Sequence, residues 1–377
     1  MSTELRVGVI GCGNISTAYF TLAPLFRGLK ITACADMNMA SAQAQAEKFG
    51  LKAMRADDLL AAGDIDAIVN LTIPAAHYPI TKRILESGKH AYSEKPLVLT
   101  IEEGLDLRRI ADAKGLKAGC APDTFLGGAH QRARKAIDDG DIGTITSGTA
   151  HVMNFGMEHW HPNPDFFYAP GGGPVLDLGP YYVSNLINLI GPVKRVGALT
   201  ATPQKARTIA NGARLGETVP VLTPTTVHGL LEFHSGAVVT LTASWDVFAH
   251  RHANMELYGS EGSIYVPDPN FFGGKVLATK RNGPAEELSD WDHPLGIPNQ
   301  EHPQGKMANY RPAGLAAMAI AIAEGRDIRC SLERTLHGVD VMTSLLKSGE
   351  TGEFITLQTN CKQPAYLGPD EARALLR

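Results

Sequence analysis

The chain has 377 residues, of which 44% are hydrophobic and 20% are charged, and its formal net charge is -4. This length and composition are typical of a globular protein with two domains and ample apolar cores. The small net charge and the lack of a basic block argue against nucleic acid or an anionic membrane as a partner. No apolar run reaches the roughly 18 residues that a membrane-spanning helix needs.

The five cysteines are odd in number, widely spaced and without a CxxC pair. A disulfide framework or a zinc site built from cysteines is therefore not expected, and we predict reduced, buried thiols in the cytoplasm. Residues 1–4 lead directly into a predicted strand, without the charged and apolar segments of a signal peptide.

Residues 5 to about 122 alternate short apolar runs with amphipathic stretches. Strands are predicted at 5–10, 31–35, 67–71, 91–93 and 116–121. Helices are predicted at 40–49, 79–87 and 102–114. Buried apolar runs joined by helices indicate a doubly wound parallel sheet with helices on both faces. We assign this first domain to residues 1–122.

The pattern changes in the second predicted domain, residues 123–377. A helix at 129–138 and a long strand at 144–154 precede a loop at 157–170 that is rich in His, Pro and aromatic residues. Strands follow at 226–234 and 237–245, and helices return at 312–324 and 331–347. In the strand at 237–245 apolar side chains alternate with Thr and Ser, which predicts one apolar and one hydroxyl-rich sheet face.

A glycine loop follows the first predicted strand. Gly11 permits a tight turn, Gly13 lets backbone N–H groups approach a pyrophosphate, and the next helix adds the partial positive charge of its N-terminus. Ser16 stands where the usual motif has a third glycine. A glycine turn before any helix looks similar, so the loop alone is weak evidence.

Asp36 ends the second apolar run, 23 residues after Gly13, where an acid can accept a hydrogen bond from the ribose 2′-OH. The alternative is that Asp36 caps the following helix. A carboxylate would repel a 2′-phosphate, and no basic residue occurs between Asp36 and Lys48. NAD(H) is therefore preferred over NADP(H).

Glu94-Lys95-Pro96 closes another predicted strand. The ordinary pKa of a lysine, about 10.4, is too high for a proton acceptor at neutral pH. Burial beside a positively charged nicotinamide is expected to lower the pKa of Lys95 toward the range of a general acid or base. The alternative is a surface lysine paired with Glu94.

Asp177 and Tyr181 lie four residues apart, which on a helix places both on one face. Pro180 would interrupt such a helix, so we expect a short turn at 174–178 and a long helix from Pro180 through Leu189. The alternatives are that Asp177 caps this helix and that Tyr181 is a packed aromatic residue.

These segments together resemble the Gfo/Idh/MocA family, the glucose–fructose oxidoreductase and inositol dehydrogenase type, over essentially the whole chain. The matching segments are a nucleotide loop, a TxPxxH segment, an EKP signature and a GGGxLxDxGxH segment. They stand here at residues 11–15, 72–77, 94–96 and 171–181. The resemblance implies a Rossmann domain followed by an α/β domain with a large open, mostly antiparallel sheet. That sheet often mediates oligomerisation, which implies a dimer or tetramer.

The resemblance also implies roles for individual residues. Lys95 would hydrogen-bond the reacting hydroxyl, Tyr181 would exchange its proton, and Asp177 would orient the substrate and offset the charge of Lys95. The implied cofactor-binding residues are Gly11, Gly13, Asn14, Ile15, Asp36, Thr72, Pro74, His77, Glu94, Lys95 and Asp123. Two positions depart from the family pattern: Tyr181 replaces the usual histidine, and Asp123 replaces a common asparagine.

The aromatic loop offers candidate contacts for sugar hydroxyls at Asn154, Trp160 and His161, beside Lys95, Asp177 and Tyr181. The alternative is a polar loop packed on its own aromatic residues. The histidine pairs at 159–161 and 250–252 have no carboxylate or cysteine at a familiar ligand spacing, so no metal is expected.

The leading interpretation is an NAD(H)-dependent oxidoreductase that acts on a secondary hydroxyl of a sugar, cyclitol or sugar derivative. One alternative is a glycosidase or lyase that uses NAD in a transient oxidation. Another is a non-catalytic cofactor-sensing regulator, against which the intact set of Lys95, Asp177 and Tyr181 argues.

Overall fold

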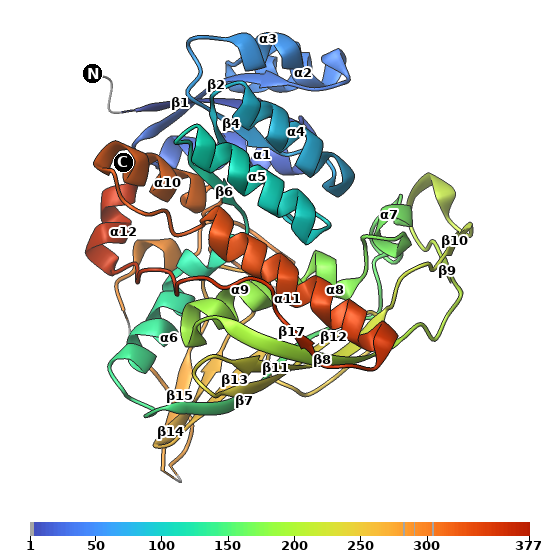
Figure 1. The fold of residues 1–377 in the computed structure, drawn as a ribbon, viewed down its shortest axis with the longest axis vertical. Helices are drawn as coiled ribbons and strands as arrows, with labels where there is room; N and C mark the ends of the chain where they lie inside the picture. The colour runs from blue at the N-terminus through green and yellow to red at the C-terminus, as the bar shows by residue number, and fades with distance from the viewer. Residues whose placement is uncertain (1–3, 282, 290, 304) are drawn as a thin grey trace.

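Two sheets organise the chain in the computed structural model, which describes residues 4–281, 283–289, 291–303 and 305–377. Residues 1–3, for which no signal-peptide segment was predicted, lie outside the described residues. Helix α11 (Leu332–Thr351) runs between the six-stranded sheet and the nine-stranded sheet and contacts elements of both (Figure 1). None of the described helices has the length and apolar composition to cross a membrane.

The six-stranded sheet is parallel, with strand order β3-β2-β1-β4-β5-β6. The strands are β1 (Leu5–Ile10), β2 (Leu29–Ala35), β3 (Lys52–Met54), β4 (Ala67–Asn70), β5 (His90–Ser93) and β6 (Ala118–Cys120). The helices are α1 (Asn14–Leu22), α2 (Met39–Phe49), α3 (Ala56–Ala61), α4 (Pro74–Glu86) and α5 (Ile101–Ala113). The strand order reverses at β1, where folds of this kind bind ligands beyond the carboxyl ends of the strands. The predicted Rossmann-type sheet is confirmed.

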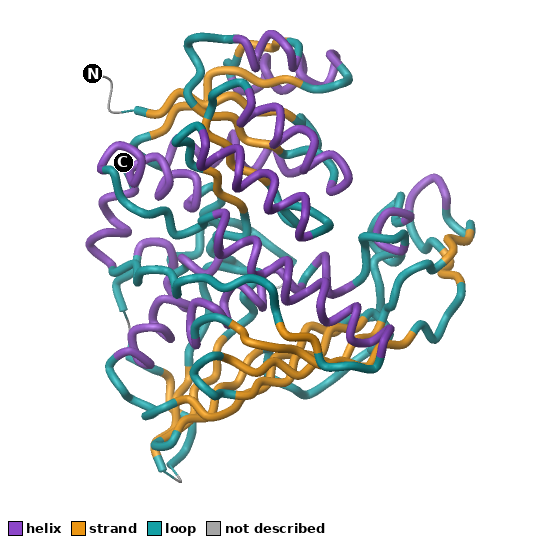
Figure 2. Tube along the Cα trace, in the orientation of Figure 1, coloured by secondary structure: helices purple, strands orange, loops and turns teal. Residues whose placement is uncertain are grey.

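The nine-stranded sheet is mixed, with order β16-β15-β14-β13-β7-β12-β11-β8-β17 and one parallel pair, β7 with β12, among its described strands. Its strands are β7 (Ile145–Met153), β8 (Val193–Ala201), β11 (Thr226–Phe233), β12 (Val238–Ser244), β13 (Met255–Gly259), β14 (Gly262–Val266), β15 (Leu277–Lys280), β16 (Glu286–Glu287) and β17 (Ile355–Thr356). The predicted open, mostly antiparallel sheet is confirmed, and helices gather on its side that faces the first domain (Figure 2).

Strand β12 has the predicted apolar face and hydroxyl-rich face. Leu241 and Ala243 are buried on the apolar face as expected. Thr242 and Ser244, on the hydroxyl-rich face, are buried as well. Their hydroxyl groups bond across the strands, Thr242 Oγ1 with His228 Nδ1 at 3.2 Å and Ser244 Oγ with Thr226 Oγ1 at 2.7 Å. Neighbouring side chains of the same face therefore replace solvent as hydrogen-bond partners.

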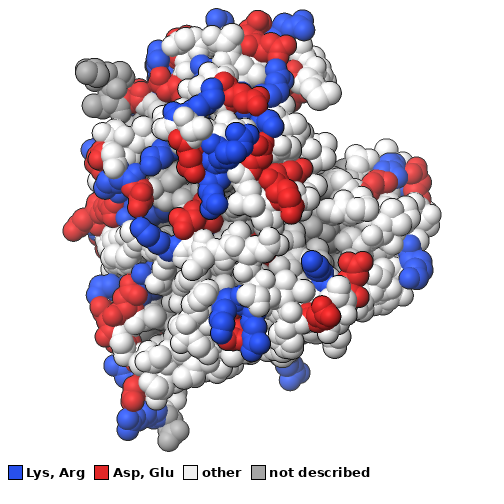
Figure 3. Space-filling model, in the orientation of Figure 1, with Lys and Arg blue, Asp and Glu red and all other residues white. Residues whose placement is uncertain are grey.

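The remaining described elements lie outside the two large sheets. They are α6 (Gly128–Asp138), α7 (Asp165–Tyr168), α8 (Pro174–Asp177), α9 (Gly179–Ile190), β9 (Ala206–Thr208), β10 (Thr218–Pro220), α10 (Ala313–Glu324) and α12 (Pro369–Leu375), with four short 3-10 turns. Strands β9 and β10 form a small separate sheet at one end of the molecule (Figure 1). Acidic and basic side chains are interspersed over the face shown in Figure 3.

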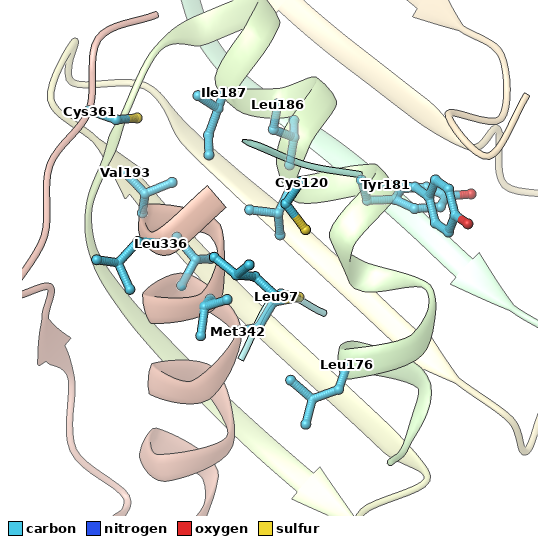
Figure 4. Packing of buried hydrophobic residues seen from close by; sticks show 14 of the residues in the cluster. Leu97, Cys120, Leu176, Tyr181, Leu186, Ile187, Val193, Leu336, Met342 and Cys361 are labelled. Atoms are coloured by element: carbon cyan, nitrogen blue, oxygen red, sulfur yellow. The ribbon is translucent and has the colours of Figure 1, made fainter. Parts of the chain in front are cut away.

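The apolar core is continuous across the predicted boundary after residue 122. Leu97 and Ile101 of the first domain belong to the same buried cluster as Leu336 and Met342 of α11. Figure 4 shows Leu336 and Met342 beside Leu97, which follows Lys95 by two residues. The C-terminal end returns to the first domain, where Arg377 N donates to Leu25 O at 2.9 Å. The boundary stays a prediction, and α11 fixes the two domains against each other.

Candidate active site

A cleft of about 2010 Å³ lies at the carboxyl ends of the parallel strands. It brings together twelve of the residues predicted from the sequence. These are Gly11, Gly13, Asn14, Ile15, Asp36, Thr72, Pro74, His77, Glu94, Lys95, Asp177 and Tyr181. The second domain supplies Asp177 and Tyr181, so the cleft is formed by both parts of the chain.

The glycine loop fits a dinucleotide. Gly11 has a φ of 106°, and a Cβ atom there would lie 2.6 Å from the carbonyl carbon and oxygen of Leu71, so only glycine is accommodated. At Gly13 no heavy atom of the described chain lies within 4 Å of the Cβ position, which leaves room for a pyrophosphate. Ser16, in place of the third glycine, is buried and its Oγ donates to Gly13 O at 2.6 Å.

Asp36 faces the cleft from the end of β2. Its Oδ2 accepts a hydrogen bond from Cys12 N and its Oδ1 accepts one from Asn38 N, both at 2.8 Å. The cap of α2 is Asn38, whose side chain accepts from Ala40 N, so the alternative role of Asp36 as a helix cap is wrong. The carboxylate is held in place by backbone N–H groups and keeps lone pairs for ribose hydroxyls.

Arg55 also lines the cleft and is exposed there. It precedes α3 and lies beyond the interval between Asp36 and Lys48, which contains no basic residue. The short strand β3 and helix α3 on either side of Arg55 were not predicted. The sequence therefore offered no reason to place Arg55 at the cleft.

Lys95 is held by Asp177 across the cleft. Its Nζ donates to Asp177 Oδ1 at 2.9 Å and to Asp177 O at 2.6 Å, and the two side chains are 16% and 21% exposed. Glu94 instead accepts from Tyr19 Oη at 3.0 Å and from the backbone N–H of Lys95 at 3.1 Å. The alternative of a surface lysine paired with Glu94 is therefore wrong.

The predicted lowering of the pKa of Lys95 applies to the chain with a nicotinamide beside it, and the chain alone shows the opposite shift. Burial lowers this pKa as expected, but the charges of Asp177 and Tyr181 and the hydrogen bond to Asp177 outweigh it, so the pKa is raised above its ordinary value. Lys95 is consequently a fixed positive charge and hydrogen-bond donor in the chain alone.

The segment that carries Asp177 and Tyr181 folds as predicted. Helix α8 ends at Asp177, and α9 begins at Gly179 with Pro180 in its first turn, where a proline costs no helical hydrogen bond. Asp177 forms no side-chain cap of α9, so that alternative is wrong. Tyr181 is 9% exposed, and Lys95 Nζ lies 5.2 Å from its ring centroid.

His77 joins two edges of the cleft. Its Nδ1 lies 2.6 Å from Pro96 O and its Nε2 lies 2.9 Å from Thr72 O, and the side chain is buried. Both ring nitrogens are occupied by backbone oxygens. His77 therefore fixes the Thr72 loop and the segment after Lys95 relative to each other.

Asp123 is not among the described residues that line the cleft. It is buried, and its Oδ2 accepts from Gly314 N at 2.8 Å in the first turn of α10. Burial is the main cause that raises the pKa of Asp123 to about 6. The structure thus places this carboxylate at a helix N-terminus rather than at a predicted cofactor contact.

Asn154, Trp160 and His161 also lie outside the described lining of the cleft. Asn154 Oδ1 accepts from Gly156 N at 2.9 Å, and Trp160 is 58% exposed. The ring of His161 packs at 5.4 Å from those of Phe166 and Phe167. The loop is packed on its own aromatic residues, and Phe166 and Phe167 form the wall of the cleft instead.

A buried ionic cluster fixes this wall. Arg207 of β9 donates to Glu158 Oε1 at 3.3 Å, to Trp245 O at 3.2 Å and to Asp246 Oδ1. Glu158 also accepts from Tyr168 Oη at the end of α7. The side chains of Arg207 and Glu158 are 5% and 4% exposed.

The polar residues of the cleft that were not predicted include Asn299, Gln300, Asn309 and Arg311. They come from the segment before α10, more than a hundred residues after Tyr181 in the sequence. No spacing pattern links them to the other motifs. The described residues contain no group of three or more His, Cys, Asp or Glu arranged to hold a metal ion.

Comparison with known proteins identifies the family of this chain. Residues 5–121 match the family model described as the oxidoreductase family with an NAD-binding Rossmann fold, and residues 130–265 match the GFO/IDH/MocA C-terminal domain. The dTDP-3,4-didehydro-2,6-dideoxy-alpha-D-glucose 3-reductase of Streptomyces violaceoruber is 30% identical over 269 residues, 69% of this chain and 72% of that protein. D-glucoside 3-dehydrogenase of Escherichia coli is 28% identical over 254 residues, 65% and 71% of the two chains.

Solved structures show the same fold. Levoglucosan dehydrogenase in complex with NADH superposes with a TM-score of 0.80 at 21% identity, covering 94% of this chain and 100% of that one. The aldose-aldose oxidoreductase of Caulobacter crescentus has a TM-score of 0.74 at 20% identity over 94% and 100% of the two chains. The chain belongs to the Gfo/Idh/MocA family and is an NAD(P)-dependent dehydrogenase or reductase that acts on CH–OH groups.

Proposed function

We propose that this enzyme uses NAD(H) to interconvert a secondary hydroxyl and a ketone on a sugar, cyclitol or sugar derivative. The observation that carries the proposal is the meeting of Lys95, Asp177 and Tyr181 in one cleft with the glycine loop. A hydroxyl donor or acceptor and a fixed cation beside a dinucleotide site are the groups that such a reaction needs.

In the oxidation direction the substrate hydroxyl would lie between Lys95 and Tyr181. Lys95 donates a hydrogen bond to the reacting oxygen, and the Tyr181 oxygen accepts its proton. Asp177 holds the ammonium group in place through the bond at 2.9 Å. A bound nicotinamide dinucleotide would supply the hydride acceptor.

A sugar-type substrate is supported by the relatives and by the cleft wall. Relatives with named activities include sugar reductases and dehydrogenases, among them a D-xylose dehydrogenase of Paenarthrobacter nicotinovorans that is 26% identical over 210 residues, 53% of each chain. Here Asn299, Gln300 and Asn309 offer amide groups for hydroxyls, and Phe166 offers an apolar ring face.

Asp36 supports NAD(H) over NADP(H), because its carboxylate is fixed at the end of β2 and would repel a 2′-phosphate. Arg55, which also lines the cleft, favours NADP(H) instead. Affinities of both reduced cofactors, measured by fluorescence, test the preference. Tighter binding of NADPH would overturn it.

We also propose a homo-oligomer, dimer or tetramer, formed through the open face of the nine-stranded sheet. Leu199, Leu230 and Val238 on this face are 75%, 43% and 44% exposed. Light scattering coupled to gel filtration tests this, and a monomer at micromolar concentration would contradict it. The five cysteines are free and buried, which supports the proposed reducing, cytoplasmic location.

The test of the reaction is a panel of sugars and polyols with NAD, followed by absorbance of NADH. Lys95→Ala is expected to bind NADH normally and to lose turnover by about 100-fold or more. Near-normal turnover in this variant would refute the role of Lys95. Release of a sugar without net NADH would favour the glycosidase or lyase, and cofactor binding without any turnover would favour the regulator.

A further inference from the structure

Arg311 lies in the same cleft as Tyr181, immediately before α10. Its guanidinium carbon is 5.7 Å from the ring centroid of Tyr181, and the ammonium group of Lys95 is 5.2 Å from the same centroid. Two cations from different parts of the chain therefore contact one phenol ring.

The position of Arg311 is fixed by polar neighbours. Its Nη2 donates to Asn270 O at 3.0 Å and to Asn270 Oδ1 at 3.2 Å, and its backbone N–H donates to Asn309 Oδ1 at 3.3 Å. The two hydrogen bonds of Nη2 thus go to amide oxygens of Asn270 and not to a carboxylate.

The two cations differ in how their charge is compensated. Lys95 has the carboxylate of Asp177 at 2.9 Å, which offsets its charge at the Tyr181 ring. Arg311 feels Asp123 and Glu94 only through space. Burial lowers the pKa of Arg311, but Tyr181 and these two carboxylates outweigh it, and the pKa is raised. Arg311 therefore stays charged and supplies the less compensated positive charge beside Tyr181.

We propose that Arg311 is a positioning residue that acts through Tyr181, holding its ring toward Lys95 and stabilising negative charge on the phenol oxygen after proton loss. The inference rests on the proposed function, in which Tyr181 exchanges the substrate proton. In the oxidation direction the O–H bond of the substrate breaks and an O–H bond forms at Tyr181. Tyr181 must be deprotonated before it can accept this proton, and Arg311 stabilises the negative charge of that deprotonated phenol.

The expected effects separate this role from a structural one. Arg311→Met should lower kcat about 10- to 100-fold and leave the KM for NAD within about threefold, because without the cation fewer enzyme molecules hold the deprotonated Tyr181 that accepts the substrate proton. The acidic limb of the kcat profile should move about one pH unit upward. Arg311→Lys, which keeps the charge but loses the planar fork, should recover part of the activity. Arg108→Met removes an exposed arginine of α5 and should change none of these values.

A spectroscopic measurement tests the inference without any substrate. The ultraviolet absorbance of phenolate is followed against pH in wild type and in Arg311→Met, each with Tyr181→Phe added as a blank to isolate the signal of Tyr181. The midpoint should lie about one pH unit higher without the guanidinium group. An unchanged midpoint would overturn the inference, even if the sugar panel shows no activity and the proposed function itself fails.

A purely structural role has its own signature. Equal losses in Arg311→Lys and Arg311→Met, together with a lower melting temperature and weaker NADH binding in both, would overturn the inference. A kcat within threefold of wild type and an unshifted pH profile in Arg311→Met would overturn it as well.

Discussion

The buried carboxyl of Asp123 should make the stability of this protein depend on pH. Burial raises its pKa from the ordinary 3.8 to about 6, against the opposing hydrogen bond from Gly314 N and the charge of Arg311. A raised pKa means that the folded chain prefers the protonated acid. The contribution of the protonated Asp123 to the free energy of unfolding is fully present below pH 3.8 and is lost as pH rises through about 6.

The size of this effect follows from the pKa difference. The rise from 3.8 to about 6 corresponds to about 3 kcal/mol, at about 1.4 kcal/mol for each pH unit. About 2 kcal/mol of it falls between about pH 4.5 and pH 7. Asp123→Asn removes the ionisation but keeps an oxygen that can accept from Gly314 N. It should therefore gain about 2 kcal/mol relative to wild type over this interval.

The assay is urea unfolding of wild type and Asp123→Asn at several pH values, compared as a difference so that the other carboxyl groups cancel. Asp66→Asn is the matched control, because the contribution of Asp66 to stability depends on pH in the opposite direction. The hydrogen bond from Arg6 lowers the pKa of Asp66, so its contribution is present at higher pH and lost as pH falls. A stability difference for Asp123→Asn that stays constant with pH would refute the reasoning.

Three further variants test the cleft. Asp177→Asn removes the charge that raises the pKa of Lys95, so the alkaline limb of the kcat profile should move to lower pH; an unmoved limb would contradict the pairing. Arg207→Met leaves buried carboxylates unpaired and should cost about 3 kcal/mol or more in urea unfolding, whereas an unchanged midpoint would show that the cluster contributes little. Gly11→Ala should destabilise the chain by about 1 kcal/mol or more, while Gly13→Ala should fold normally and only weaken NADH binding; equal behaviour of both in thermal unfolding and fluorescence titration would contradict the loop geometry.

The parts of the fold that the sequence predicts are those with a strong local pattern. Strand β4 is buried throughout and strands β1 and β2 end in buried apolar runs, while α5 has a full amphipathic period and a capping box at Thr100 and Glu103. Strand β3 and helix α3 are short and half exposed, so they carry no comparable signal. Helix α4 begins at Pro74 and contains Pro79, which the sequence pattern placed at its start because a proline inside a helix is costly.

The candidate site likewise contains residues that a local sequence pattern predicts and residues that only packing places. The glycine loop, Lys95 and the pair of Asp177 and Tyr181 belong to compact motifs, and the cleft collects all of them. Trp160 and His161 were selected by residue type within a loop, and side-chain packing decides which face of such a loop meets the cleft. Their aromatic neighbours take that place, because the apolar rings pack against the cluster around Trp245.

The lysine at the centre of the site shows most clearly where sequence reasoning stops. Lys95 and Asp177 are 82 residues apart, and no property of either segment sets the distance between their charged atoms. That distance depends on α11, whose Leu336 lies so close to α5 that a Cβ at Gly104 would come within 2.3 Å of it. The domain packing therefore sets the pKa of Lys95 in the chain alone, where burial lowers this pKa but the nearby charge of Asp177 outweighs burial. The same packing brings Arg311 to Tyr181, so the chemistry of the cleft belongs to the interface of the two domains rather than to either one.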